Sequence, residues 1–286
     1  MLLAIAVMAT ACQRSEETSP SSKVQAETPA AAAQPAASPD EKPSQEMARM
    51  MELMQAIYGP ADGGHVIAEL PDYGDARGKS QYRITPVGMH EIAPDRVALV
   101  ANANDASDET PGHGQPGLLN VYLLRKQDGK WKVERRFENV AEMGSWGRLG
   151  SVEWVELGEG RPGFAVVAGG TWQGISIRDM ALFDLGDPKL RNLATKIGLV
   201  GSDNKGDCDE RRHRCWSVKG KWRFERTAQQ AYDDLVFDFS GYTESRPEDS
   251  AEDVARSRSA VSNSARYALR DGDYVLASGE HSVPNP

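Results

Sequence analysis

The chain has 286 residues, 40% of them hydrophobic, and a formal net charge of −9 at pH 7. This length and apolar content allow a hydrophobic core, so we expect a folded protein with one large domain or two small ones. The acidic balance argues against a nucleic-acid-binding protein, which needs a basic face to neutralise phosphates, and it fits a basic or neutral partner or simple solubility.

The chain begins with a short apolar run that ends on a single cysteine. Residues 2–11 are apolar and finish in small residues, as in a secretory signal. The sequence ATAC at 9–12 resembles a bacterial lipobox, although no Lys or Arg precedes it. The resemblance implies a lipoprotein signal peptide over 1–11, a lipid on Cys12, and attachment to a membrane through acyl chains. Gln13 follows the cysteine, which by resemblance to sorted lipoproteins implies the outer membrane, facing the periplasm; a buried strand with an incidental cysteine is the alternative.

The next segment, residues 12–44, is rich in Pro, Ala, Ser and Glu and poor in branched apolar and aromatic residues. Such a segment cannot bury enough apolar surface to offset the loss of chain entropy, so we expect a disordered tether. No later stretch approaches the ~20 apolar residues that a membrane-spanning helix needs. The predicted organisation is therefore a lipidated tether followed by a β-rich globular domain over residues 45–286.

A helix is expected where this domain begins. Ser44 can cap it, and Gly59 with Pro60 ends it. One face carries apolar residues at helical spacing: Met47, Met50, Met51, Met54 and Ile57. This stripe predicts packing against the core, with an adaptable methionine-lined binding groove as the alternative.

After the helix, short runs of alternating or β-branched apolar residues are separated by Gly, Pro, Asn and Asp. These runs predict strands at 81–87, 96–101, 118–126, 131–137, 151–157, 163–168, 176–184, 216–226, 235–240 and 274–278. Asp128 and Gly129 mark the clearest hairpin turn. The pattern predicts an all-β, mainly antiparallel body. A weak internal repeat favours a propeller-like or curved arrangement, and a sandwich is the alternative. The serine-rich, charged segment 243–269 is expected as a surface loop or short helix.

Two further cysteines, Cys208 and Cys215, flank a polar turn. In an exported chain such a pair predicts a disulfide that closes a hairpin loop and contributes about 2–3 kcal/mol. The alternative is a metal site with His213 as third ligand, which lacks the close C-x-x-C spacing of structural zinc sites.

Acidic loops are candidates for calcium. Asp203, Asp207 and Asp209 lie close together in sequence and offer oxygen ligands, but their spacing does not fit an EF-hand loop. The loop over residues 102–114 has the same composition. Both loops are expected to be solvated turns without a cofactor, and Ca²⁺ binding is the alternative.

No catalytic motif is present: neither a nucleophile elbow, nor a zinc-protease helix, nor a phosphate loop occurs. The tryptophans are more informative. Trp146 and Trp172 have glycine neighbours that imply turns, so both are candidates for an exposed partner-binding patch, together with Asp209 and Glu210; core tryptophans are the alternative.

The lipobox, the tether and a soluble β-rich domain resemble the periplasmic immunity lipoproteins of type IV and type VI secretion effector systems. The resemblance implies a binding protein, not an enzyme, that blocks a secreted effector enzyme. The acidic loop 203–210 is where insertion into a basic cleft is expected. Two alternatives are a structural or assembly lipoprotein that binds Ca²⁺, and an envelope hydrolase whose carboxylate pair is assembled by the fold.

Overall fold

The structure is a computed structural model of the chain, and it describes residues 45–286 except residues 62, 229 and 252–253. These residues belong to one compact unit, Pro43–Pro286. The predicted signal peptide, the lipid site at Cys12 and the tether lie outside the described residues and stay predictions. In the described part of the chain, no helix combines the length and apolar character needed to cross a membrane.

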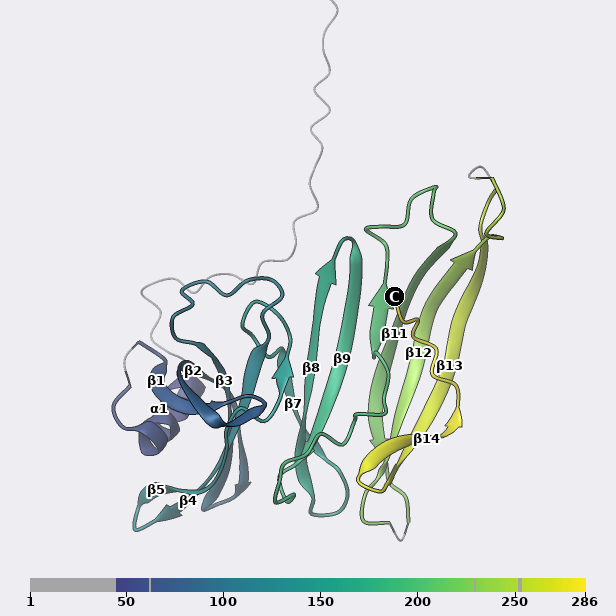
Figure 1. The fold of residues 1–286 in the computed structure, drawn as a ribbon. Coiled ribbons are helices and arrows are strands. Elements are labelled where there is room, and N and C mark those ends of the chain that lie inside the picture. The colour runs from purple at the N-terminus through teal and green to yellow at the C-terminus, as the bar shows by residue number, and fades with distance from the viewer. Residues whose placement is uncertain (1–44, 62, 229, 252–253) are drawn as a thin grey trace, which may run out of the picture. The chain divides into compact units, whose positions relative to one another are not determined.

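The predicted fold class is confirmed: one helix precedes two antiparallel sheets (Figure 1). The first sheet has the order β1 (Val66–Asp72), β2 (Asp75–Ala93), β3 (Arg96–Asp105), β4 (Gly117–Gln127) and β5 (Lys130–Phe137), with β6 (Glu142–Met143) also paired to β4. The second sheet has the order β14 (Asp273–Gly279), β13 (Ser257–Arg270), β12 (Asp234–Ser245), β11 (Arg214–Glu225), β10 (Gly201–Asp203), β9 (Ile175–Asp184), β8 (Pro162–Trp172) and β7 (Ser151–Glu156).

The helix α1 (Gln45–Tyr58) uses its methionine stripe for core packing. Met50, Met54 and Ile57 are buried against the first sheet, and Met47 and Met51 pack at the margin of the same cluster. The core interpretation of the stripe is therefore confirmed over the binding-groove alternative. Burial of this face, more than helix propensity, stabilises so short a helix.

The predicted hairpin turn is also confirmed. Asp128 and Gly129 have φ values of 51° and 77°, and they join β4 to β5 with Gln127 opposite Lys130. Positive φ at both central residues is the type I′ turn that matches the twist of antiparallel strands.

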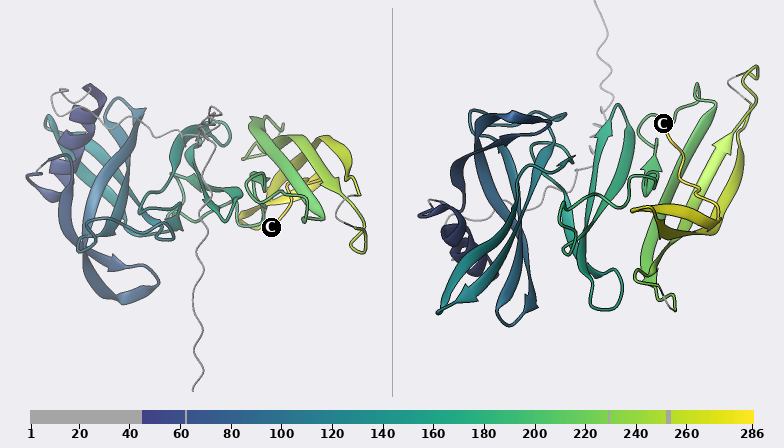
Figure 2. Two further views of the ribbon diagram at one scale, coloured as in Figure 1. Left: turned by 90° about the horizontal axis from the view of Figure 1, so that it is seen from above. Right: turned by 60° about the horizontal axis from the view of Figure 1, so that its bottom comes forward.

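Of the expected arrangements, the structure has the curved sheets and not the propeller. Within each of the two sheets, apart from β6, neighbouring strands follow one another in chain order (Figure 2). The long strand β2 bends at two register shifts, after Pro86 and after Glu91, and such bulges increase local twist. The expectation of a loop or helix over 243–269 is wrong for most of its length. Residues 257–270 form β13, which pairs with β12 from Ser257 to Tyr267, because its alternating small and polar residues suit a strand with one solvated face.

The two sheets share a hydrophobic cluster. Val100, Val121 and Leu123 of the first sheet lie in the same buried cluster as Phe164 and Phe183 of the second. This contact sets the loops of the first sheet beside the β8–β9 hairpin, and that junction carries the site described next.

Candidate functional site

Three rings from three separate segments form a stack on the surface, which we call the aromatic stack. His113 lies between Trp146 and Trp172, with ring centroids 5.0 Å and 5.1 Å away and interplanar angles of 27° and 16°. Trp146 is 54% exposed and Trp172 is 40% exposed. The predicted exposure of both tryptophans is confirmed; their role in partner binding stays a prediction.

Trp146 is held in a strained turn. Ser145 and Arg148 exchange backbone hydrogen bonds of 3.2 Å and 3.0 Å, while Trp146 and Gly147 have φ values of 56° and 66°. This is a type I′ turn, whose first central position normally takes Asn, Asp or Gly because other side chains are strained at positive φ. Strain of this kind persists where the surrounding structure imposes it, and it is concentrated at functional sites.

The surroundings of this turn fix its position. The buried side chain of Asn102 donates from Nδ2 to the carbonyl oxygen of Gly147 over 2.8 Å. A Cβ at Gly147 would lie 2.6 Å from Cγ of Pro111, so only glycine fits there. Gly147 N also donates to the carbonyl oxygen of Gln115 over 2.9 Å, which ties the turn to the loop that carries His113.

Trp172 ends β8 at a second turn of the same type. Gln173 and Gly174 have φ values of 48° and 80°, and Trp172 pairs with Ile175 across the turn. The six-membered ring of Trp172 lies over Gly170, where a Cβ would come 2.6 Å from Cζ3 of the indole. Two short glycine-containing turns therefore present the two indoles.

The predicted disulfide between Cys208 and Cys215 is formed, with a Cα–Cα distance of 5.6 Å. It closes the segment 208–215 within the connection between β10 and β11, residues 204–213, which we call the disulfide loop. This loop touches the turn of Trp172, because Gly206 N donates to the carbonyl oxygen of Gly174 over 3.0 Å. A Cβ at Gly206 would lie 2.7 Å from Cα of Gly174, so the two backbones meet directly. The disulfide loop thus braces one side of the aromatic stack.

Two arginines from the connection between β12 and β13 hold the other side of the disulfide loop. Arg246 donates from Nη2 to the carbonyl oxygen of Glu210, and Arg256 donates from Nε to that of Arg212 over 2.8 Å. His213 directs Nδ1 toward the carbonyl oxygen of Pro247 at 3.2 Å. Glu210 therefore contributes its backbone to this clamp.

The three carboxylates predicted to bind calcium are engaged separately. Asp203 accepts a bond from Lys205 N at 3.3 Å, Asp207 accepts one from Arg212 at 2.7 Å, and Asp209 pairs with Arg211 at 2.6 Å. Hydrogen bonds from Arg211 hold the pKa of Asp209 below its usual value. These contacts neutralise two of the three acids locally.

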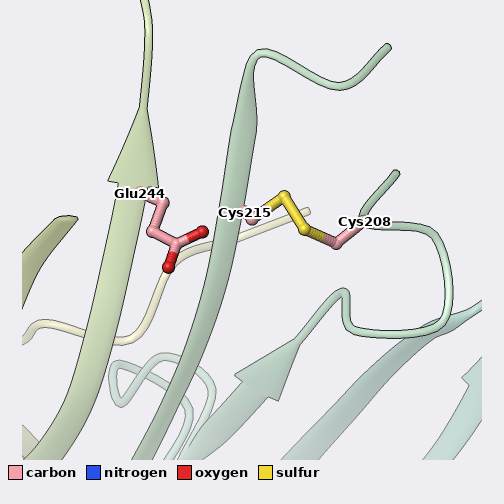
Figure 3. A group of neighbouring side chains, drawn as sticks. All are labelled: Cys208, Cys215 and Glu244. Carbon is pink, nitrogen blue, oxygen red and sulfur yellow. A yellow bond between two sulfur atoms is a disulfide. The ribbon is translucent and has the colours of Figure 1, made fainter. Parts of the chain in front are cut away.

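Figure 3 shows the group of potential metal ligands that the described residues bring together: Cys208, Cys215 and Glu244, whose ligand atoms lie within 4.8 Å of one another. The two sulfurs are bonded to each other and offer no thiolate, and Glu244 pairs with Arg258 at 3.3 Å. Neither the oxygen-rich cage of calcium nor a site including His213 is among such groups in the described residues. Calcium binding stays an untested prediction.

Carboxylates surround the Trp146 side of the aromatic stack. We define this acidic rim as Asp105, Asp108, Glu109 and Glu142. Asp105 accepts bonds from the backbone and hydroxyl of Ser107 at 2.8 Å and 2.6 Å, which lower its pKa. The Asp108 carboxylate accepts a bond from the Gln115 amide at 2.6 Å. These donors are neutral, so the negative charges are not cancelled.

Three carboxylates of the acidic rim line a small hollow of about 190 Å³, and the fourth, Glu109, lines a neighbouring hollow with Trp146. The lining of the small hollow includes Asp105, Asp108, Glu142, Tyr82 and Pro111. The pKa of Tyr82 rises to about 12, first through burial, then through its bond to a neighbouring carboxylate, and further through the charges of Asp105 and Glu142. Burial and Asp72 account for most of this rise, and the two rim carboxylates add to it.

A second hollow, of about 460 Å³, lies where His90 of β2 stacks on Trp154 of β7 at 5.1 Å. Its polar side chains are committed to the fold. Arg161 bonds to Asp184 at 3.5 Å, and Glu156 accepts a bond from Gly160 N at 3.1 Å. The aromatic stack, with two exposed indoles, is the stronger candidate site.

No family model, curated protein or solved structure matches this chain. The function is therefore argued from the aromatic stack and its surroundings.

Proposed function

We propose that the protein is a lipid-anchored binding protein of the bacterial cell envelope, facing the periplasm and acting as an immunity protein that blocks an effector enzyme. The aromatic stack carries this proposal: two indoles are exposed on turns that the fold holds rigid. The lipobox resemblance at Cys12 supports the membrane anchor, by implication in the outer membrane.

The energetics of the aromatic stack suit a docking surface. Trp is enriched among the residues that dominate protein interfaces, because a large aromatic side chain buries 150–250 Å² and loses little rotamer entropy. The turn at Trp146 adds strain that helps no part of the core, since its indole is more than half exposed. A role in binding accounts for both the strain and the exposure.

Rigidity gives the aromatic stack a further advantage in binding. The turn of Trp146 is bonded to Asn102 and Gln115, and the turn of Trp172 is braced by the disulfide loop. A surface that is ordered before it meets its partner loses less entropy on binding. This suits an inhibitor, which must hold its target tightly enough to suppress its activity.

In-cell photo-crosslinking tests this proposal with the full chain. A photoreactive phenylalanine analogue replaces Trp146 in one variant and Ile67 in the other; Ile67, on β1, is 54% exposed, as Trp146 is. We expect a protein partner to be captured at position 146 and not at position 67. The enzymatic activity of the purified partner should fall when the wild-type chain is added to it. Equal capture at both positions would refute the binding face, and a captured enzyme of unchanged activity would refute the inhibitor role.

A further inference from the structure

We propose that the partner presents a basic segment to the aromatic stack, and that one of its Arg or Lys side chains enters the acidic hollow beside Trp146. This inference rests on the proposed function, because it names the chemistry of the partner that the stack binds.

The charge of the face supports a basic partner. The four carboxylates of the acidic rim form no ion pair within the described residues, unlike Glu225 of the second sheet, for example, which pairs with Arg223 at 2.6 Å. Two guanidinium groups, of Arg83 and Arg148, line the neighbouring hollow. Arg83 donates to the backbone carbonyl of Asp108 over 3.2 Å, so it does not pair with the carboxylate. The face therefore keeps an excess of negative charge.

The geometry places the carboxylates within reach of a chain lying on the indole. Pro111 and Gly147 line the acidic hollow and also a larger adjoining hollow of about 490 Å³ that includes Trp146. The two hollows therefore adjoin at Pro111 and Gly147, beside the indole of Trp146. Arginine suits this place, because its planar guanidinium stacks on aromatic faces and binds carboxylates through paired hydrogen bonds.

Uncompensated carboxylates beside an exposed aromatic also fit the energetics of recognition. Complementary charge raises the association rate and rejects partners of like charge, whereas the aromatic anchor supplies most of the affinity. On this face the aromatic stack therefore binds apolar surface of the partner, and the acidic rim selects for positive charge.

The test uses two variants of the full chain with the same net charge. The rim variant carries Asp105→Asn, Asp108→Asn and Glu142→Gln. The control variant carries Glu46→Gln, Glu52→Gln and Asp271→Asn, three exposed acids on α1 and in the β13–β14 turn. Asparagine at 105 and 108 keeps the oxygen acceptors for Ser107 and Gln115, and melting curves verify that both variants fold.

The probes are an oligo-arginine peptide, an equally long oligo-glutamate peptide and a neutral chitin oligosaccharide, followed by the partner captured at position 146. We expect the rim variant to bind oligo-arginine and the partner about tenfold more weakly or worse, and the control variant to change less than about twofold. The difference should vanish at an ionic strength of about 1 M, where the screening length falls to ~3 Å.

Three outcomes would overturn the inference: equal losses in both variants, no loss in the rim variant, or tight binding of the neutral oligosaccharide that the rim substitutions leave unchanged. If a partner is captured at position 146 and binds the rim variant as tightly as the wild type, the inference of a basic partner is refuted and the proposed function is not. A failure to capture any partner at 146 refutes the proposed function instead.

Discussion

Replacing Trp146 by asparagine separates the effect of the indole on the free energy of unfolding from its effect on the affinity for a partner. Two effects on the free energy of unfolding oppose each other. A non-glycine residue in the left-handed region costs about 1–2 kcal/mol, and asparagine tolerates this region best, so Trp146→Asn relieves part of that cost. The lost stacking on His113 removes about 0.5–1.5 kcal/mol. The free energy of unfolding should therefore change by less than about 1 kcal/mol.

Binding should respond very differently. Truncating an aromatic interface anchor costs about 2 kcal/mol or more, which is roughly a 30-fold loss of affinity. Urea unfolding measures the first quantity and titration with the captured partner measures the second. Phe164→Ala calibrates the unfolding assay, because this fully buried ring should cost about 3–5 kcal/mol. If Trp146→Asn destabilises the fold as much as Phe164→Ala, the indole is a structural anchor and the reasoning from strain and exposure fails.

Three further predictions concern other parts of the chain. Replacing Cys208 and Cys215 by serine should lower the free energy of unfolding by about 2–3 kcal/mol, measured by calorimetry, and weaken partner binding through the turn of Trp172, measured by titration; unchanged binding would contradict the bracing of that turn. Burial lowers the pKa of His281 below the ~6.5 of the unfolded chain, so its contribution to stability is complete above that pH and is lost as the pH falls through the folded value. Measured by urea unfolding between about pH 7 and pH 5, the free energy of unfolding should fall more steeply for the wild type than for His281→Gln, and equal slopes would contradict this. Cys12→Ala should move the protein from the membrane fraction to the soluble fraction and abolish labelling by palmitate, and a labelled variant would exclude Cys12 as the lipid site.

The local parts of the fold could be predicted from sequence because their causes are local. The methionine spacing of α1 and the turn at Asp128 are set by neighbouring residues, and both are confirmed. The arrangement of strands depends on which strands pair across the chain, and many short alternating runs are compatible with blades or with curved sheets. The strand over 257–270 was missed because its small polar residues lack the β-branched and aromatic signal of a typical strand.

Part of the aromatic stack could be predicted from the sequence. Glycine neighbours pointed to exposed turns at Trp146 and Trp172, but His113 joins them only through the contact of the two sheets. The pairing of Asp209 with Arg211 two residues later could have been inferred, since a side chain at that spacing in a turn reaches the carboxylate. The loop over residues 102–114 supplies Asp105, Asp108 and Glu109 of the acidic rim, and only the fold adds Glu142 and places these acids beside an indole.

The meeting of Gly206 and Gly174 has a consequence for how this protein can diversify. The disulfide loop meets the β8–β9 turn through the backbones of Gly206 and Gly174, whereas the side chains of Lys205 and Glu210 are exposed to solvent. Lys205 and Glu210 can then change identity while the ring geometry is preserved. A lineage could revise which partner it recognises at these positions and keep the same presentation of its indoles, so long as both glycines remain.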